Sequence, residues 1–284
     1  MPLVTSAELL RAAEAGGYAV GAFNCNNLEI LQAILAAAEA ERSPVIVQTS
    51  QGALQYAGLR LLAAMIRTAA EEATVPVALH LDHGTDFAIA VACLRAGYTS
   101  LMFDGSKLPY AENAAATRRI VEMAHAVGVS VEGELGTIAG TEDMVSVSEQ
   151  EALYTDPAQA ESFARETGVD ALAVAVGTAH GVYRREPHLD FRRLEAIRRR
   201  VPVPLVLHGS SGVPDDQIRE AVRHGVRKIN IDTELRQAFS ATLRSWLPGH
   251  PDEIDPRKIL APARQAMQAK VQEKMRLFGS SGRA

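Results

Sequence analysis

Residues 75–84 read VPVALHLDHG, an apolar run that closes on an aspartate, a histidine and a glycine. Near-continuous apolarity in a short run rich in β-branched residues is what a strand covered on both faces requires. Asp82 and His83 come at the carboxyl end of the run, just before Gly84. The segment therefore predicts a buried strand of a parallel sheet with polar side chains at one end.

Seven other runs share these features, and segments with helical spacing, such as residues 28–38 and 59–66, separate them. The eight predicted strands occupy residues 19–24, 44–50, 75–82, 100–106, 129–136, 171–178, 203–209 and 228–232. Strands that alternate with helices pair in parallel through crossovers. Eight such units predict an α/β fold, a closed (β/α)8 TIM barrel. An open doubly wound sheet is the structural alternative.

The chain length fits one such barrel. A TIM barrel needs about 250 residues, and the chain has 284, so we expect a single domain over residues 1–284. The longest irregular connections are residues 136–150 and 181–190, which makes them candidate lids over the barrel.

One additional helix is predicted at each end of the chain. The extra N-terminal helix covers residues 5–15, where Thr5 or Ser6 begins the helix and Glu8 completes a capping box. The long C-terminal helix covers residues 256–278, with Asp255 as N-cap and Pro256 in the first position.

Composition excludes several functional classes. The net charge is −5 and the positive residues are scattered, so the basic face of a nucleic-acid-binding protein is not expected. Two cysteines are too few for a disulfide framework. The first residues do not have the pattern of a signal peptide, and no apolar run approaches the roughly 20 residues of a membrane span. We therefore expect a cytoplasmic protein without a membrane partner.

Polar residues stand at the carboxyl ends of the eight predicted strands. Catalytic residues of a TIM barrel come from this end, and polar groups in apolar surroundings cost free energy unless they bind something. The residues are Asn24, Ser50, Asp82, His83, Asp104, Glu134, His180, His208, Asn230 and Asp232. A ring of this kind predicts one functional site at the mouth of the barrel.

Three residues of this ring are histidines, and each is followed by a glycine. His83, His180 and His208 follow the third, sixth and seventh strands, whose ends barrel closure brings together. Three imidazoles with an open fourth position are the ligands of a catalytic zinc ion. The alternative is that one or two of these histidines only form hydrogen bonds in the mouth. His80, two residues before Asp82, is predicted to be a satisfied core histidine.

Two loops predict a phosphate site. Residues 209–212, GSSG, follow the seventh strand, and residues 230–233, NIDT, follow the eighth strand and lead into a helix. TIM barrels commonly bind phosphate with these two loops, because backbone N–H groups and a helix N-terminus favour an anion. Ser210 and Ser211 add hydroxyl groups. The alternative is an ordinary flexible turn at residues 209–212.

Longer motifs resemble those of a known enzyme family. They are AFNCNNLE, LHLDHG, SLMFDGSKLPYAEN, VEGELGTIAGTED, VGTAHGVY, VLHGSSGVP, KINIDTELRQAF and DPRKILAPA, which run from residue 22 to beyond residue 260. In these motifs the chain resembles the class II, metal-dependent fructose-bisphosphate aldolases, of the branch shared with tagatose-bisphosphate aldolases. The resemblance implies a glycolytic lyase that reversibly cleaves fructose 1,6-bisphosphate to dihydroxyacetone phosphate and glyceraldehyde 3-phosphate.

The resemblance also implies a role for each matching residue. The zinc ligands would be His83, His180 and His208, with Asp104 and Glu134 at a possible secondary metal position. Asp82 would be the acid/base on the C4 hydroxyl, Glu142 would move the C3 proton, and Asn230 would steady the enediolate. The substrate and phosphate contacts would come from Asn24, Ser50, Ser106, Gly181, Gly209, Ser210, Ser211, Asp232, Thr233 and Arg257. The carbonyls of Ala179, Gly181 and Gly209 would hold a monovalent cation, Na⁺ or K⁺.

The chain departs from the family pattern at one place. Many class II aldolases carry two acidic residues on the lid, whereas Thr141 precedes Glu142 here, so Glu142 alone must serve. Asp232 is typical of the fructose branch, and tagatose 1,6-bisphosphate is the alternative substrate. Arg257 is expected to reach into the site of a neighbouring subunit, which predicts a homodimer or homotetramer.

Two other functions compete with this interpretation. A Schiff-base aldolase needs a desolvated lysine with a lowered pKa. Lys228 begins the eighth strand at the wrong end of the barrel, so Lys107 is the plausible candidate. A non-catalytic sugar-phosphate-binding protein would need no acid/base pair, and the presence of Asp82 and Glu142 argues against it.

Overall fold

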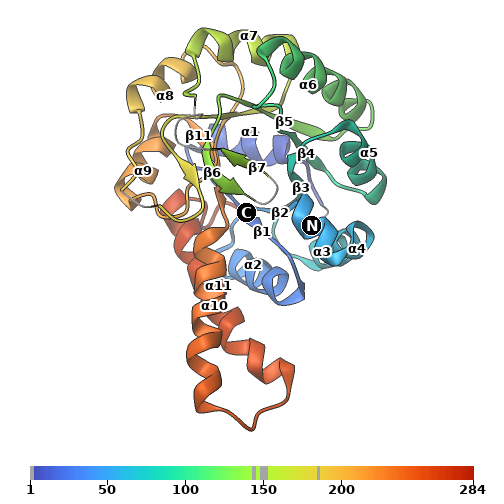
Figure 1. Cartoon of the computed structure of the whole chain (residues 1–284), viewed down its shortest axis with the longest axis vertical. Helices are drawn as coiled ribbons and strands as arrows, with labels where there is room; N and C mark the ends of the chain where they lie inside the picture. Colours follow the sequence, from blue (N-terminus) through green and yellow to red (C-terminus); the bar gives the residue numbers. More distant parts are fainter. Residues whose placement is uncertain (1–2, 143–144, 148–152, 184–185) are drawn as a thin grey trace.

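The computed structural model of the chain describes residues 3–142, 145–147, 153–183 and 186–284. Eight parallel strands form a closed barrel in the order β1-β11-β10-β8-β5-β4-β3-β2, with helices around it (Figure 1). The strands are β1 (Val20–Asn24), β2 (Val45–Ser50), β3 (Val77–Gly84), β4 (Ser100–Phe103), β5 (Ser130–Leu135), β8 (Ala171–Val174), β10 (Leu205–Leu207) and β11 (Val226–Ile231). The predicted TIM barrel is confirmed, and the open sheet is wrong.

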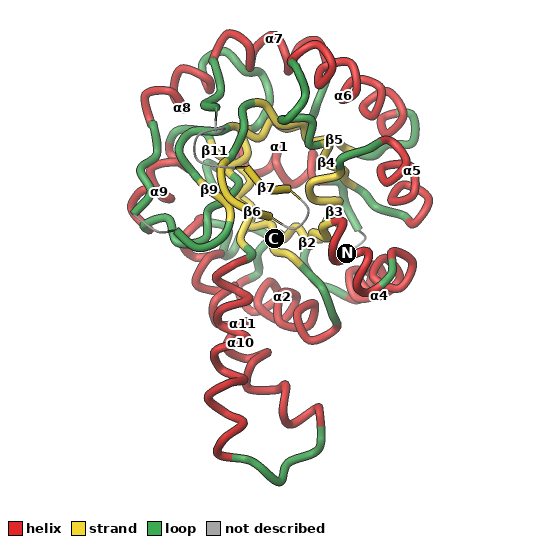
Figure 2. The backbone as a smooth tube through the Cα atoms, in the orientation of Figure 1, coloured by secondary structure: helices red, strands yellow, loops and turns green. Residues whose placement is uncertain are grey.

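Helices follow the strands and cover the outside of the barrel (Figure 2). They are α2 (Leu28–Glu41), α3 (Gln51–Ala57), α4 (Leu59–Glu72), α5 (Phe87–Ala96), α6 (Tyr110–His125), α7 (Pro157–Thr167), α8 (Phe191–Arg198), α9 (Asp215–Arg223) and α10 (Thr233–Trp246). A large apolar cluster between strands and helices includes Phe23, Leu79 and Phe163, each fully buried. Burial of this apolar surface is the main stabilising term of the fold.

The two added helices form as predicted. Helix α1 (Ser6–Gly16) has Thr5 as its N-cap and a complete capping box with Glu8. Its Leu9 and Leu10 belong to a second apolar cluster, which fills the lower interior of the barrel with small strand residues such as Ala22. Helix α1 therefore closes one end of the barrel.

Helix α11 (Pro256–Phe278) begins after Asp255, whose side chain accepts a hydrogen bond from the backbone N–H of Arg257. It packs against α2 and α10. Between the packed parts of α10 and α11, every residue from 236 to 262 is exposed or half-buried. This segment, called the arm below, includes η1 (Leu247–Gly249) and projects away from the barrel (Figure 1).

The predicted irregular connection at residues 136–150 contains regular structure. Strand β6 (Ala139–Glu142) pairs with β7 (Val145–Val147) in an antiparallel hairpin, and also in parallel with β9 (Ala179–His180). The prediction of an irregular segment was therefore wrong where the segment is described. Residues 181–183 and 186–190 contain neither helix nor strand, as expected.

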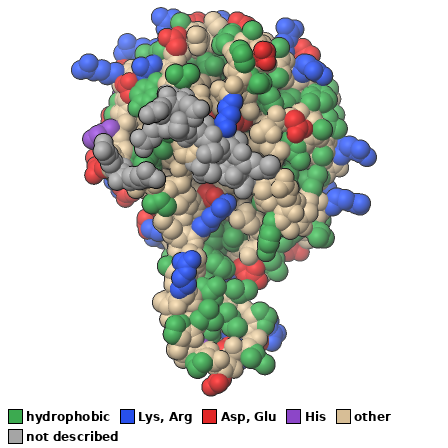
Figure 3. All heavy atoms as spheres, in the orientation of Figure 1, with side chains coloured by type: hydrophobic (Ala, Val, Ile, Leu, Met, Phe, Trp, Pro, Cys, Tyr) green, Lys and Arg blue, Asp and Glu red, His purple; other side chains and the backbone are tan. Residues whose placement is uncertain are grey.

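The described surface and helices can be compared with the composition. On the described part of the face in Figure 3, Lys and Arg side chains are dispersed among other residues. No helix in the described ranges is both long and apolar enough to cross a membrane.

The capping box of α1 gives a stability prediction. Thr5→Ala removes the hydroxyl that accepts from the backbone N–H of Glu8 at 3.2 Å, so the free energy of unfolding at neutral pH should fall by about 1 kcal/mol. Thr5→Ser keeps the cap and should stay close to wild type. Urea unfolding of the three proteins measures the difference, and an unchanged midpoint for Thr5→Ala would contradict the role of the cap.

The unfolding experiment can also be repeated at lower pH. The backbone and side-chain hydrogen bonds from Thr5 lower the pKa of Glu8 from its ordinary value of 4.5. The stabilisation is therefore complete above pH 4.5 and is lost as the pH falls through the lowered pKa. The advantage of wild type over Glu8→Gln should shrink over that range.

Candidate active site

The structure brings the three predicted histidines together at the mouth of the barrel. His83 lies near the end of β3, His180 on β9, and His208 directly after β10. The ring centroid of His83 is 4.7 Å from that of His208 and 5.2 Å from that of His180. One nitrogen from each ring lies within 4.8 Å of the others, although the three residues are far apart in sequence.

Hydrogen bonds determine which ring nitrogens face the centre of this cluster. Nδ1 of His83 lies 2.8 Å from Oδ2 of Asp104, and Nε2 of His208 lies 2.7 Å from Oε1 of Glu132. A carboxylate only accepts hydrogen bonds, so each of these nitrogens carries the proton. The remaining pair, Nε2 of His83 and Nδ1 of His208, is 2.9 Å apart.

This arrangement fits a divalent metal ion. A histidine ligand usually donates its second N–H to a carboxylate, which fixes the tautomer and raises the basicity of the binding nitrogen. Asp104 and Glu132 do this for His83 and His208. Two basic nitrogens that face each other at 2.9 Å need a cation between them or a shared proton.

The charges of the site favour metal binding. Burial raises the pKa of Asp104, but its hydrogen bonds from His83 and Ser106 outweigh this and hold the pKa below its ordinary value. Burial likewise raises the pKa of Glu132, but the charge of Lys228 and the hydrogen bond from His208 outweigh this and lower it below its ordinary value. Burial lowers the pKa of His208, which favours the neutral ring. Ionised carboxylates behind a neutral imidazole are the protonation states that a metal site requires.

A second cluster overlaps the first. His83, Asp104 and Glu134 also offer ligand atoms within 4.8 Å of one another. Asp104 and Glu134 are the two residues expected at a secondary metal position. Nδ1 of His83 lies 3.9 Å from Oε2 of Glu134, but the same nitrogen already donates to Asp104. In this arrangement Asp104 orients His83.

The backbone at His83 is unusual. Its φ of +48° lies in the left-handed region, and the β3–β4 register shifts between Leu81 and Gly84. Successive side chains of a regular strand point to opposite faces, but this irregularity lets Asp82 and His83 both serve the mouth. A Cβ on Gly84 would meet the carbonyl oxygen of Met102 at 2.8 Å, so glycine is required after the histidine. Such local strain is characteristic of functional sites.

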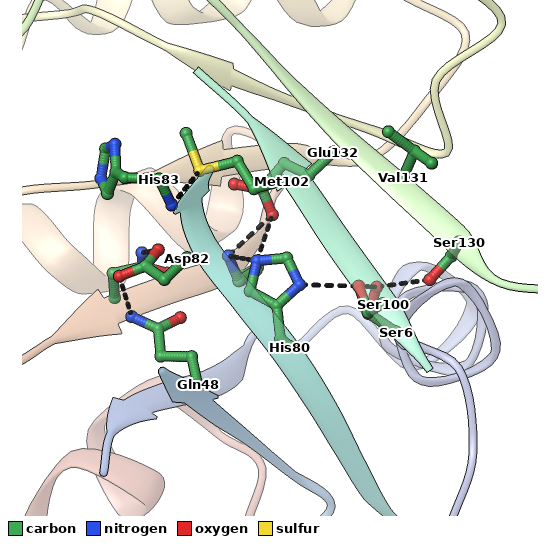
Figure 4. Close-up of polar contacts among 12 residues, drawn as sticks. Ser6, Gln48, His80, Asp82, His83, Ser100, Met102, Ser130, Val131 and Glu132 are labelled. Carbon is green, nitrogen blue, oxygen red and sulfur yellow. Dashed lines mark hydrogen bonds and ion pairs between the residues drawn. The ribbon is translucent and has the colours of Figure 1, made fainter. Parts of the chain in front are cut away.

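Asp82 lies beside the histidines, with its carboxylate fully buried. Three side-chain amides donate to it: Gln48 at 3.0 Å, Asn230 at 3.1 Å and Asn24 at 3.2 Å. Figure 4 shows Gln48 pointing at Asp82 from the neighbouring strand. The amides hold the carboxylate in one orientation without neutralising it.

The predicted phosphate residues fall into two groups. Ser211 accepts from the backbone N–H of Glu234 at 3.3 Å, which ties the loop after β10 to the first turn of α10. Buried Ser210 lies in the same loop, and Asp232 and Thr233 begin α10. On the opposite side of the barrel, Ser50 caps α3, and the hydroxyl of Ser106 donates to Asp104 at 2.6 Å.

The loops after β9 and β10 are joined by a tyrosine. The Tyr183 hydroxyl accepts from the N–H of Ala179 and donates to the carbonyl of Gly209, both at 2.7 Å. Gly209 and Gly181, with φ of +61° and +89°, are predicted with Ala179 as a monovalent-cation site. Tyr183 already uses one lone pair of the Gly209 carbonyl.

One predicted residue, Arg257, is not brought into the cluster: it lies at the start of α11, where its 90% exposed side chain pairs with Asp255 at 2.8 Å. Glu142 ends β6, and its side chain lies outside the described part of the chain.

Four residues of the site were not predicted from the sequence: Gln48, Glu132, Tyr183 and Lys228. A signal existed for three of them. Gln48, Glu132 and Lys228 are polar residues in apolar runs, each two positions before a predicted site residue and therefore on the same strand face. Tyr183 lies in a loop, and its spacing gave no such signal.

A (β/α)8 barrel with three histidines and a buried aspartate at its mouth has the architecture of a metal-dependent barrel enzyme. The sequence model described as class-II fructose-bisphosphate aldolase matches residues 4–283. The chain therefore belongs to the class II fructose-bisphosphate aldolase family, whose members are carbon–carbon lyases and generally depend on a metal.

Individual relatives agree with this family. The fructose-bisphosphate aldolase of Thermus caldophilus is 48% identical over 99% of this chain and 100% of its own length. The probable fructose-bisphosphate aldolase of Bacillus subtilis (strain 168) is 47% identical over the full length of both chains.

Among solved structures, the YdjI aldolase from Escherichia coli K12 superimposes with a TM-score of 0.88 at 37% identity, over 99% of both chains. A putative fructose-1,6-bisphosphate aldolase from Coccidioides immitis gives a TM-score of 0.86 at 34% identity, over 97% of this chain and 96% of that one.

Proposed function

We propose that the protein is a zinc-dependent aldolase that reversibly cleaves fructose 1,6-bisphosphate to dihydroxyacetone phosphate and glyceraldehyde 3-phosphate. The observation that carries the proposal is the buried Asp82 carboxylate beside the cluster of His83, His180 and His208. A binding protein has no need of a buried acid/base next to a metal site. The names of the two bacterial relatives support fructose bisphosphate as the substrate.

His83, His180 and His208 would hold the ion, because two of them present nitrogens whose opposite N–H is fixed by a carboxylate. A zinc ion bound there would supply a Lewis acid that polarises the C2 carbonyl of the ketose. The protein's contribution is to keep the ligands oriented and the surroundings dry. The backbone strain at His83 and the buried carboxylates of Asp104 and Glu132 serve this purpose.

Proton transfer falls to the chain's own residues. Asp82 would take the proton of the C4 hydroxyl as the C3–C4 bond breaks, which forms the aldehyde product. Glu142 would then give a proton to C3, which completes dihydroxyacetone phosphate. Asn230 donates to Asp82 from the same side of the mouth, so it can hold both the base and the oxygen that gains negative charge.

The two groups of phosphate residues suit a bisphosphate. Gly181, Ser210, Ser211, Asp232 and Thr233 would bind the phosphate of the triose that forms dihydroxyacetone phosphate, next to the N-terminus of α10. Ser50, Ser106 and Arg257 would bind the other phosphate, and Asn24 would complete the sugar contacts. The carbonyls of Ala179, Gly181 and Gly209 would hold Na⁺ or K⁺ between them.

The arm supports assembly into a homodimer or homotetramer. It exposes Leu247 and Ile254, the latter by 88%, and apolar side chains are visible along it in Figure 3. Arg257 lies on the arm, and its side chain is 90% exposed and pairs with Asp255. We propose that a second copy covers the arm and that Arg257 serves the site of that copy. The single domain over residues 1–284 and the cytoplasmic location stay predictions.

The Schiff-base alternative has less support. Its candidate, Lys107, is exposed to solvent, whereas a Schiff-base lysine is desolvated. The side chain of Lys228 lies inside the barrel, but its ammonium group pairs with Glu132 at 2.7 Å, and a paired ammonium is a poor nucleophile. Tagatose 1,6-bisphosphate stays the second candidate substrate, because it differs from fructose 1,6-bisphosphate only at C4, and Asp82 would be the base for the C4 hydroxyl of either epimer.

Metal removal tests the function. Chelation should abolish cleavage of fructose 1,6-bisphosphate, and added zinc should restore it, because the described residues of the site offer no other electron sink. Measurement of kcat/KM on the tagatose epimer in the same preparation compares the two substrates. A preference for tagatose bisphosphate would reassign the substrate, and activity in fully metal-free protein would end the metal-dependent mechanism.

Replacement of Asp82 tests the base. Asp82→Ala should lower kcat by about 10²- to 10⁴-fold, while zinc content stays the same because Asp82 is not a ligand. Asp216→Ala, an exposed acidic residue on α9, is the control. Normal turnover by Asp82→Ala would remove the residue from the mechanism.

Mixed oligomers test the role of Arg257. Asp82→Ala and Arg257→Ala should each be nearly inactive alone. If Arg257 acts across the interface, a hybrid of the two variants contains one intact site, so refolding them together should recover activity. Lack of recovery in hybrids shown to form by mass spectrometry would place Arg257 in the site of its own chain.

A further inference from the structure

A buried ion pair lies directly beneath the histidine cluster. Lys228 on β11 and Glu132 on β5 are 0% and 1% exposed. Nζ of Lys228 donates to Oε2 of Glu132 at 2.7 Å, and Oε1 of the same carboxylate accepts from Nε2 of His208 at 2.7 Å. The two oxygens of one carboxylate are thus divided between a cation and an imidazole.

On the side away from the histidine cluster, Lys228 contacts His80. Its Nζ lies 3.3 Å from Nε2 of His80, and Nδ1 of His80 lies 2.7 Å from the hydroxyl of Ser100. An ammonium group only donates, so Nε2 of His80 accepts and Nδ1 carries the proton to Ser100. The series continues through Ser6 at 2.6 Å and Ser130 at 2.9 Å (Figure 4). This column connects the cluster to helix α1 at the closed end.

We propose that Lys228 is a positioning residue that selects the tautomer of His208: it holds one oxygen of Glu132, turns the other onto Nε2 of His208, and so leaves Nδ1 without a proton, as a ligand atom for the metal. The amide nitrogen of Asn230, 3.3 Å from Nδ1, is placed to donate to the same unprotonated nitrogen. This inference rests on the metal site of the proposed function. It adds a residue that touches neither metal nor substrate, and it explains why a lysine stands in the interior of the barrel.

The geometry makes the selection necessary. His83 presents Nε2 to the cluster and His208 presents Nδ1, so the two rings use opposite nitrogens. A neutral imidazole in water can carry its proton on either nitrogen. If the proton of His208 moved to Nδ1, it would point at His83 and block the position between the two rings.

Substitution of Glu132 gives a sharp test. In Glu132→Gln, the ammonium of Lys228 still requires an acceptor, so the amide oxygen should turn to Lys228 and the amide NH₂ to Nε2 of His208. Nε2 must then accept, which moves the proton to Nδ1. In the double variant Glu132→Gln/Lys228→Met the amide is free to turn over, and the original tautomer should return.

Two measurements report the outcome. Nitrogen-15 NMR of the imidazole rings in metal-free protein shows which nitrogen of His208 carries the proton. Equilibrium zinc binding gives the Kd, which should rise roughly 10- to 100-fold in Glu132→Gln, the usual cost of losing a partner of a metal ligand. The double variant should recover most of this loss.

A matched control separates positioning from general instability. Lys274 is also buried, at 4% exposed, and pairs with Glu234 at 2.7 Å outside the barrel interior. Lys274→Met should cost stability as Lys228→Met does, yet leave the His208 tautomer and the zinc Kd within about twofold of wild type.

The proposal is overturned if Glu132→Gln keeps the proton of His208 on Nε2, or if the double variant binds zinc no better than the single one. If Glu132→Gln does not fold, Lys228→Met alone must weaken zinc binding more than Lys274→Met does, and equal values overturn the proposal. Because the NMR experiment uses neither metal nor substrate, its result is independent of whether fructose bisphosphate is cleaved.

Discussion

Each charged side chain described here in the interior of the barrel has an ion-pair or hydrogen-bond partner. An eight-stranded barrel is just wide enough for side chains to fill, so water is excluded and an unpaired ion would be costly. Here Glu132 divides its two oxygens between Lys228 and His208, and the carboxylate of Asp82 receives hydrogen bonds from three amides. The active site depends on these buried polar contacts, because they orient both the metal ligands and the base.

Much of this architecture could be predicted from the sequence because its causes are local. Apolar β-branched runs mark the strands, and the caps at Thr5 and Asp255 mark the ends of two helices. The positions of His83, His180 and His208 followed from one further assumption, that barrel closure gathers strand ends. Each of these signals lies within a few residues of the feature it specifies.

The features that escaped prediction depend on pairing between distant residues. The sequence places Glu132 and Lys228 96 positions apart, and only the register of a closed barrel brings them into contact. The choice of ring nitrogen at His208 depends on that contact in turn. Residues 139–142 have little strand character of their own, and their pairing with β9 supplies the missing hydrogen bonds. Tertiary context decides such cases.

The pairing between β6 and β9 restricts how this part of the surface can change. Gly140 lies opposite His180, and a Cβ there would collide with the His180 carbonyl. Surface hairpins usually tolerate gain or loss of a residue, but here a shift of one position would move the glycine away from the histidine. The distance along the chain from β5 to β6 is therefore as constrained as a catalytic side chain. Evolutionary variation in length should be found in the arm or at the far ends of the helices instead.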